Sequence, residues 1–215
     1  MASEMNTVIK KIDPRKTAVI VVDMTNDFVC KETGHKSAGT AILPQMAAFL
    51  DKCREKGMKI IYTTHVYRDT DEDIPYYMDA KIRRIDGKRP YTDDTYGIQV
   101  HDMIAPKGNE LVIKKHHFSG FEGTDLDIVL RKNKIENTVI VGVCSDVCCM
   151  ETGRAAMYLG YGVIFIAELN RTLPRDTKWG KVSEEEMNRI ALVLLEATTG
   201  DVMSEEEFWK LDMEA

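Results

Sequence analysis

The sequence lacks several features that would assign it to a specialised class of protein. No apolar stretch is long enough to cross a bilayer, and the polar segment from Met1 to Lys11 lacks the apolar region of a signal peptide. Basic residues are not in excess, because 29 Lys and Arg stand against 35 Asp and Glu and the net charge is −6. We therefore expect neither nucleic acid nor a membrane surface as a partner.

Cysteine is scarce, and its spacing matches no disulfide framework, zinc pattern or C-x-x-C redox pair. The five cysteines are Cys30, Cys53, Cys144, Cys148 and Cys149. An odd number of thiols without a framework favours a reducing, cytoplasmic location. Internal repeats and low-complexity tracts are also absent. A chain of 215 residues with this ordinary composition predicts a single domain over residues 1–215, with a core from about 12 to 200.

Short apolar runs alternate with helical patterns along the chain. This alternation predicts a three-layer α/β/α, Rossmann-like fold with an open, mostly parallel sheet of about six strands. Five strands are expected at Thr17–Val22, Met58–Thr63, Glu110–Lys114, Thr138–Val141 and Gly162–Ala167. Helices are expected over Leu43–Lys56, near Thr124–Lys132, shortly after Gly142, and from Ser183 and Ser204. Thr124, Ser183 and Ser204 each begin a capping-box pattern, with Asp or Glu three residues later.

The segment from His65 to Ile104 fits neither pattern. It contains an acidic run, Asp69 to Asp73, followed by basic residues at Lys81–Arg84 and Lys88–Arg89. It leaves from the carboxyl end of a strand, where open α/β sheets bind their ligands. We therefore expect a lid-like insertion over about residues 65–104, although a solvated surface excursion is the alternative. Its basic side chains either bind a substrate carboxylate or are simply solvated: Arg68, Arg83, Arg84 and Lys88.

Cys148 follows a strand end that runs directly into a helix start. The apolar run Thr138–Val141 is bounded by Gly142, and Ser145 suits a helix N-cap, which places Cys148 in the first helical turn. There the positive end of the helix dipole favours a thiolate, and free N–H groups can receive an oxyanion. The alternative is that Cys148 is a small buried apolar residue, as most free cysteines are.

Two charged residues are expected at the same edge of the sheet. Asp23 directly follows the first strand, where it either accepts a thiol proton as general base or caps nearby N–H groups. Lys115 ends the third strand and has the same parity as Ile113, which directs it to the core unless it reaches water. A core-facing lysine needs a carboxylate partner, and Asp23 is the expected one. Together with Cys148 they provide a base, electrostatic support and a nucleophile.

Three motifs connect these residues to a known group of proteins. Val22-Asp23-Met24-Thr25-Asn26-Asp27-Phe28 is similar to D-x-Q-N-D-F, and Lys115 to Phe121 is similar to K-x-x-x-S-x-F. Gly142 to Thr152 is similar to G-V-x-T-D-x-C-V-x-x-T. Their order, spacing and strand context agree from Lys16 to Leu195. By these motifs the chain resembles the isochorismatase-like cysteine hydrolase superfamily, which includes nicotinamidases, N-carbamoylsarcosine amidohydrolases, biuret hydrolases and ureidoacrylate amidohydrolases.

The resemblance implies a catalytic mechanism. Cys148 would attack the carbonyl carbon of a C–N bond and form a thioester, while Asp23 takes the thiol proton and later passes it to the leaving amine or ammonia. Lys115 would keep Asp23 ionised and support the thiolate. A cis peptide bond between Val143 and Cys144 is also implied, with the N–H groups of Cys144 and Cys148 forming the oxyanion hole. Four side chains are expected to bind substrate: Phe28, His65, Tyr67 and Phe121.

Departures from the superfamily pattern narrow the expected function. Metal-binding nicotinamidases carry D-x-H after the second strand, and this chain has His65-Val66-Tyr67 there. A lone His beside Tyr is a poor metal site, so we expect no metal and no other cofactor, and nicotinamide is disfavoured. Thr25, in place of the motif's glutamine, would alter substrate contacts.

The expected function is a metal-independent cysteine amidohydrolase acting on a small amide, ureido or carbamoyl compound. One alternative is a vinyl ether hydrolase of the isochorismatase type, whose members lack the nucleophilic cysteine. The other is a non-catalytic binding protein on the same fold. The resemblance also implies a homo-oligomer, either a dimer or a tetramer.

Overall fold

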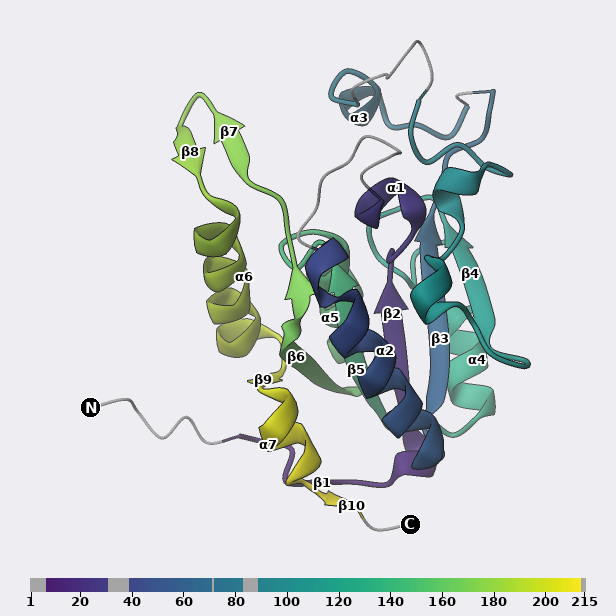
Figure 1. Ribbon diagram of the computed structural model, residues 1–215, viewed down its shortest axis with the longest axis vertical. Helices are drawn as coiled ribbons and strands as arrows, with labels where there is room; N and C mark the ends of the chain where they lie inside the picture. The colour runs from purple at the N-terminus through teal and green to yellow at the C-terminus, as the bar shows by residue number, and fades with distance from the viewer. Residues whose placement is uncertain (1–6, 31–38, 71, 83–88, 214–215) are drawn as a thin grey trace.

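The computed structural model describes residues 7–30, 39–70, 72–82 and 89–213. At its centre is a six-stranded sheet in the order β4-β3-β2-β5-β6-β9, in which every neighbouring pair is parallel (Figure 1). The strands are β2 (Thr17–Val22), β3 (Lys59–His65), β4 (Leu111–Lys115), β5 (Asn137–Val143), β6 (Gly162–Arg171) and β9 (Asp201–Met203). The predicted fold class, an open parallel α/β sheet, is confirmed.

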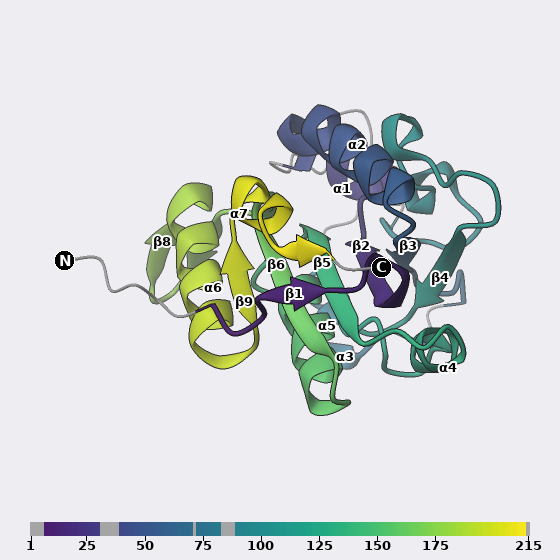
Figure 2. The ribbon, with the colours of Figure 1, turned by 90° about the horizontal axis from the view of Figure 1, so that it is seen from below.

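Helices cover both faces of the sheet, as the view from below shows (Figure 2). One face carries α2 (Gly39–Glu55) and α7 (Glu205–Trp209), and the other carries α4 (Leu126–Lys132), α5 (Cys148–Tyr158) and α6 (Glu184–Thr198). Alternate residues of β2 supply the two cores: Val19 and Val21 pack with α2, while Ile20 and Val22 pack with α4 and α5. Because both faces are covered, the whole of β2 is buried, which explains its uninterrupted apolar run.

Two of the three predicted helix starts have the expected side-chain caps. The Ser183 and Ser204 hydroxyls accept hydrogen bonds from the N–H groups three residues later, and Ser204 forms a complete capping box. The third pattern, Thr124 to Asp127, does not form such a box. Helix α4 begins at Leu126, and the Asp127 carboxylate instead binds Arg131 Nε at 2.9 Å and the Tyr161 hydroxyl at 2.7 Å. Arg131, one turn further along the same helix, and the distant Tyr161 compete with the local cap.

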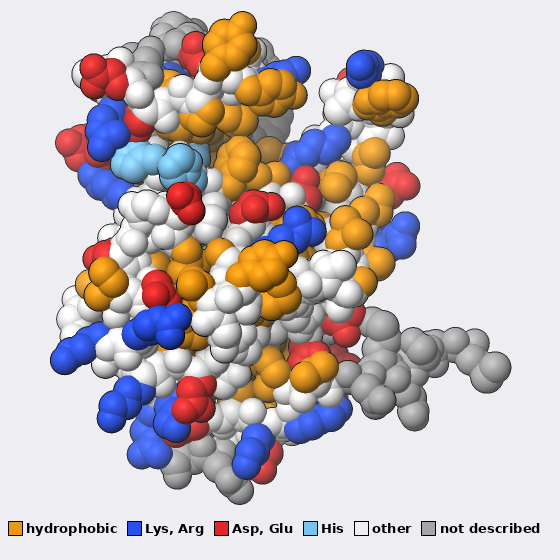
Figure 3. All heavy atoms as spheres, turned by 180° about the vertical axis from the view of Figure 1, so that it is seen from behind, with side chains coloured by type: hydrophobic (Ala, Val, Ile, Leu, Met, Phe, Trp, Pro, Cys, Tyr) orange, Lys and Arg blue, Asp and Glu red, His pale blue; other side chains and the backbone are white. Residues whose placement is uncertain are grey.

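Several short elements were not predicted. A hairpin, β7 (Arg175–Thr177) and β8 (Gly180–Val182), stands clear of the body and carries the exposed Trp179 (Figures 1 and 3). Near the chain ends, β1 (Lys11–Ile12) pairs with β10 (Asp212–Met213). Segments of two or three residues are too short to show a hydrophobic period, so the sequence pattern does not reveal them.

The segment between β3 and β4 includes α3 (Tyr76–Asp79) and two short 3₁₀ turns, Tyr96–Ile98 and Asp102–Ile104. Helix α1 (Asn26–Val29), which begins within the Val22–Phe28 motif, holds this segment by hydrogen bonds. Asn26 Nδ2 donates to the Tyr96 carbonyl at 3.0 Å, and the Asp27 carboxylate accepts from the Tyr91 N–H at 2.6 Å. A Cβ on Gly97 would lie 2.3 Å from the Asp27 carboxylate, so any larger residue there would displace that carboxylate.

The basic residues of this segment are only partly described. Arg83, Arg84 and Lys88 lie outside the described residues. The Arg68 guanidinium lies 3.4 Å from the Asp73 carboxylate, so a local acid already balances its charge. In the part of the chain that the structure describes, no helix combines the length and apolar character needed to span a membrane.

Candidate active site

Three predicted residues meet at the carboxyl edge of the sheet. Asp23 directly follows β2, Lys115 ends β4, and Cys148 begins α5 after β5. Lys115 Nζ lies 2.8 Å from Asp23 Oδ2 and 3.4 Å from Cys148 Sγ. Asp23 and Lys115 are fully buried, and Cys148 is 5% exposed. The predicted pairing of Lys115 with Asp23 is confirmed, and the buried charges compensate each other.

The neighbouring strand β3 fixes Asp23. The Asp23 N–H donates to the Thr63 carbonyl at 3.1 Å, and the Thr63 hydroxyl donates to Asp23 Oδ1, also at 3.1 Å. Asp23 has a φ of 52°, in the left-handed region that aspartate tolerates better than most residues. Lys115 Nζ also donates a hydrogen bond to the His117 carbonyl at 3.1 Å. Thr63 is not among the predicted site residues, because nothing in the sequence distinguishes it from an ordinary strand residue.

Helix α5 begins at Cys148 itself, and Val147 is its N-cap. The prediction of Ser145 as N-cap is wrong, because the Ser145 hydroxyl instead donates to Asn188 Oδ1 at 2.7 Å. The peptide bond between Val143 and Cys144 is cis. The Cys144 carbonyl accepts from the N–H groups of Val147 and Cys149, both at 3.1 Å. Among the described residues, the N–H groups of Cys144 and Cys148 have no acceptor, so both are available to a ligand oxygen.

The electrostatics of the site do not favour a thiolate in its free state. Burial raises the pKa of Cys148 well above its usual value; the Lys115 ammonium opposes this rise, and the Asp23 carboxylate adds to it. For Lys115 itself, burial lowers the pKa, but the charges of Asp23 and ionised Cys148, with the hydrogen bonds to both, together raise it. Burial therefore opposes the thiolate that the start of the helix was expected to favour.

His65 lies beside this cluster and is neutral. Its Nδ1 is 3.5 Å from Lys115 Nζ and 3.4 Å from the His117 carbonyl. Burial, followed by the charge of Lys115, lowers the pKa of His65 to about 4. The ring meets Tyr67 edge-on, with centroids 4.7 Å apart. An uncharged imidazole here avoids a second buried cation beside Lys115.

An aromatic cluster surrounds His65. Its ring lies 5.7 Å from Tyr91 and 6.0 Å from Phe118, and Tyr91 stacks on Phe28 at 4.7 Å. Thus Phe28, His65 and Tyr67 occupy one cluster, together with Tyr91 and Phe118, which the sequence analysis did not identify. Tyr91 belongs to an irregular segment without a hydrophobic period, so no pattern points to it.

Tyr67 has an electrostatic connection to the nucleophile. Burial raises the pKa of Tyr67 to about 12, and the charge that Cys148 carries when ionised contributes to the rise. The fourth expected pocket residue, Phe121, lies elsewhere. Its ring stacks on Tyr161 at 6.1 Å, beyond the end of α5 opposite Cys148. The structure thus brings three of the four expected substrate-binding side chains together.

The site does not resemble a metal centre. Within the described residues, no group of three or more His, Cys, Asp or Glu is arranged to hold a metal ion. The nitrogen of His65 that faces the cluster lies 3.5 Å from the Lys115 ammonium, which would repel a divalent cation. These residues therefore do not fit the metal that nicotinamidases of the superfamily bind.

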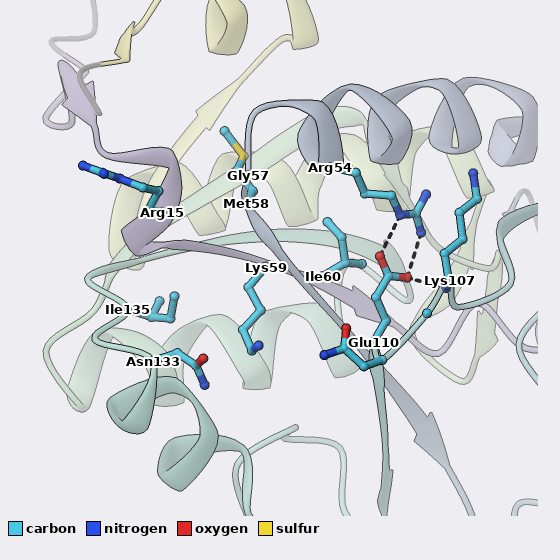
Figure 4. Close-up of a pocket in the computed structure, with 12 residues that line it drawn as sticks. Arg15, Arg54, Gly57, Met58, Lys59, Ile60, Lys107, Glu110, Asn133 and Ile135 are labelled. Atoms are coloured by element: carbon cyan, nitrogen blue, oxygen red, sulfur yellow. Dashed lines mark hydrogen bonds and ion pairs between the residues drawn. The ribbon is translucent and has the colours of Figure 1, made fainter.

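A cavity lies at the opposite edge of the sheet (Figure 4). This cavity, of about 520 Å³, lies near the starts of β3 and β4, and its lining includes Lys59, Arg54 and Glu110. Arg54 is held by Glu110 through two hydrogen bonds, of 2.7 and 2.9 Å. The lining of this cavity contains none of the predicted site residues. The strand ends of Asp23, Lys115 and Cys148 are at the other edge, so we locate the site there.

Comparison with known proteins supports a family assignment. The family model described as an isochorismatase domain matches residues 17–207. N-carbamoylsarcosine amidase from an Arthrobacter species is 29% identical over 173 residues, and the match covers 76% of this chain but only 63% of that protein. A ureidoacrylate amidohydrolase from Rhizobium rhizogenes is 26% identical, with 77% of this chain and 74% of that protein covered.

Solved structures agree with this assignment. A cysteine hydrolase from Pseudomonas syringae pv. phaseolicola has a TM-score of 0.85 at 28% identity, and the match covers 93% of this chain and 94% of that one. The matched family region extends from the first residue of β2 into α7, so it contains every strand of the six-stranded sheet and all three residues of the buried cluster. The predicted resemblance is confirmed, and the chain belongs to the isochorismatase family.

Proposed function

We propose that the protein is a metal-independent cysteine amidohydrolase, which cleaves a C–N bond of a small amide, ureido or carbamoyl compound. The observation that carries this proposal is the buried Asp23–Lys115–Cys148 cluster, with Nζ distances of 2.8 and 3.4 Å. A vinyl ether hydrolase has no use for a nucleophilic thiol, and the relatives named above are an amidase and an amidohydrolase.

In the first half of the proposed reaction, Cys148 Sγ attacks the carbonyl carbon as the thiol proton moves to Asp23. The carbonyl oxygen becomes an oxyanion, which the N–H groups of Cys144 and Cys148 bind. When the tetrahedral intermediate collapses, the C–N bond breaks and Asp23 returns the proton to the leaving nitrogen. Ammonia or an amine departs, and the acyl group remains on Cys148 as a thioester.

In the second half, water replaces the amine. Asp23 takes a proton from the water molecule as its oxygen attacks the thioester carbon, and the same two N–H groups bind the second oxyanion. Collapse of this intermediate breaks the C–S bond, and Cys148 regains its proton from Asp23. Lys115 stays charged throughout, so its ammonium stabilises whichever neighbour carries the negative charge.

The aromatic cluster supports a small, planar substrate. Phe28 and Tyr67 supply apolar surface, and the neutral imidazole of His65 supplies a hydrogen-bonding group. Planar carbamoyl and ureido groups can stack on flat aromatic rings of this kind. A homo-oligomer, dimeric or tetrameric, belongs to the same proposal, and light scattering of the purified protein measures its mass.

The test is ammonia release from a panel of nicotinamide, N-carbamoylsarcosine, biuret, ureidoacrylate and simple carbamoyl amino acids. Cys148→Ala is the negative control, and it should abolish turnover while leaving the fold intact by circular dichroism. Release that depends on Cys148 supports the amidohydrolase and identifies its substrate branch. Turnover that persists in Cys148→Ala would refute the covalent mechanism, and a folded wild-type protein that releases ammonia from no compound of the panel favours a binding protein.

A further inference from the structure

The loop that precedes Cys148 is anchored from outside the catalytic cluster. The Ser145 N–H donates to the Arg171 carbonyl at 2.8 Å, and the Ser145 hydroxyl donates to Asn188 Oδ1 at 2.7 Å. The next residue, Asp146, binds Arg175 Nη2 at 2.6 Å and the Thr172 hydroxyl. The four anchors come from the end of β6, the residue that follows it, the start of β7 and α6, so the C-terminal third of the chain holds this loop.

Asn188 is an unusual residue for its position. It lies on the buried face of α6, three residues before Ala191 and seven before Leu195, both of which pack into the core. Its exposed fraction is 9%, and that of Ser145 is 0%. A polar side chain on a core-facing stripe is unfavourable unless it is hydrogen-bonded. The partner that satisfies it is the residue next to Cys144 of the oxyanion hole.

We propose that Asn188 is a positioning residue, which acts through Ser145 to hold the Cys144 N–H where the oxyanion develops. The inference rests on the proposed function. Ser145 is bonded directly to Cys144, so its orientation determines how the Cys144 peptide group is placed. An oxyanion hole works because its donors are fixed before the reaction. The Asn188 contact keeps this loop from rotating, and Asn188 itself touches neither the thiol nor the substrate.

Four variants test the role. Asn188→Leu keeps the branching and the number of heavy atoms of the side chain but removes the acceptor, and Ser145→Ala removes the donor. We expect each to lower kcat about tenfold, a fraction of the loss from removing an oxyanion-hole donor outright, with KM little changed. The double variant should be no worse than either single one, because both break the same contact. Ser145→Thr keeps a hydroxyl and should regain most of the activity that Ser145→Ala loses.

Arg189→Leu is the matched control on the same turn of α6, since Arg189 is exposed and has no hydrogen bond or ion pair with the loop among the described residues. It should behave as the wild type. If Asn188→Leu fails to fold by circular dichroism, the Ser145→Ala and Ser145→Thr pair carries the test, because these variants differ only at one hydroxyl-bearing side chain.

Two further measurements separate positioning from general damage. Iodoacetamide alkylation of Cys148 needs the thiolate but no oxyanion hole, so its rate should stay within about twofold of wild type. The Cys148 thiol can add to a short aliphatic aldehyde: Sγ bonds to the carbonyl carbon, the C=O double bond becomes a single bond, and the oxygen takes the thiol proton. The affinity for this adduct should fall with kcat, because its oxygen occupies the hole.

The outcomes are distinct. Three results would overturn the positioning role and leave the amidohydrolase standing. These are a parallel loss of alkylation and turnover, losses that multiply in the double variant, and an unchanged kcat in Asn188→Leu. A wild-type protein that neither turns over the panel nor binds the aldehyde would overturn the proposed function, and the positioning role with it.

Discussion

Replacing Lys115 with methionine tests whether the cluster depends on a compensated buried charge. The substitution keeps the length of the side chain and removes the ammonium that lies 2.8 Å from Asp23 Oδ2. The Asp23 carboxylate, which is 0% exposed, then keeps one side-chain hydrogen bond, from Thr63. Removing one partner of a buried ion pair costs about 3–5 kcal/mol, and we expect Lys115→Met to lose that much of its free energy of unfolding.

The double variant Asp23→Asn/Lys115→Met separates the cost of an unpaired buried charge from the cost of the two substitutions themselves. Asp23→Asn alone leaves the Lys115 ammonium without its counter-charge and should also be strongly destabilising. With both charges gone, no ion remains unpaired, so the loss should be about 2 kcal/mol or less. The double variant is thus expected to be more stable than either single one, which is a large departure from additivity.

Urea unfolding followed by circular dichroism measures all three variants. Lys114→Met is the matched control, because the neighbouring ammonium is 45% exposed and pairs with Asp93 at the surface. It should change stability by less than about 1 kcal/mol. If Lys115→Met costs no more than this control, or if the double variant loses the sum of the single losses, the buried charge pair does not hold the site as argued.

Four further predictions follow from the geometry. The pKa of His65 is about 4 in the folded protein against 6.5 in the unfolded chain. The unfolded chain therefore takes up a proton as pH falls between these values, and the free energy of unfolding of the wild type should drop by about 3 kcal/mol by pH 4. In urea unfolding at pH 4, His65→Asn should lose less of its free energy of unfolding, and a variant of the exposed His117, His117→Asn, should match wild type. Gly97→Ala forces the Asp27 carboxylate to move, so KM should rise more than kcat falls, whereas an unchanged KM would contradict a role of the insertion in binding. Alkylation of Cys148 should accelerate through pH 9, because burial raises its pKa; a plateau below pH 8 would contradict this. Elemental analysis should find no stoichiometric zinc, iron or manganese, and a bound metal would refute the metal-independent mechanism.

The parts of the fold that the sequence predicted are those with a long periodic signal. Strand β2 has the predicted bounds, Thr17–Val22, because a strand covered on both faces is apolar at every position. The three-residue β9 and the hairpin β7–β8 have no such signal. The cap of α4 was predicted wrongly for another reason: Arg131, one turn further along the same helix, and Tyr161 bind the Asp127 carboxylate, which therefore does not cap the helix start.

The predicted site shows the same division. Strand parity and chain order were enough to bring Asp23, Lys115 and Cys148 together, because the ends of parallel strands share one edge. The residues that were missed reach the site across long sequence separations. Tyr91 arrives on an irregular segment, and Asn188 arrives from a helix near the end of the chain. Periodicity describes one element at a time, so it contains no information about such contacts.

The raised pKa of Cys148 is consistent with a nucleophilic role once the charges are counted. In the resting site Lys115 is positive, Asp23 negative, and Cys148 and His65 neutral, so the buried cluster has no net charge. In the proposed reaction the thiol proton moves to Asp23 as Sγ attacks, and the negative charge passes from the carboxylate to the substrate oxygen. Charge is thus transferred between groups near Lys115 and is never created in a dry site. A protonated His65, or a metal ion in its place, would add positive charge beside Lys115 and destroy this balance. The neutral imidazole is therefore as much a requirement of the proposed mechanism as the thiol.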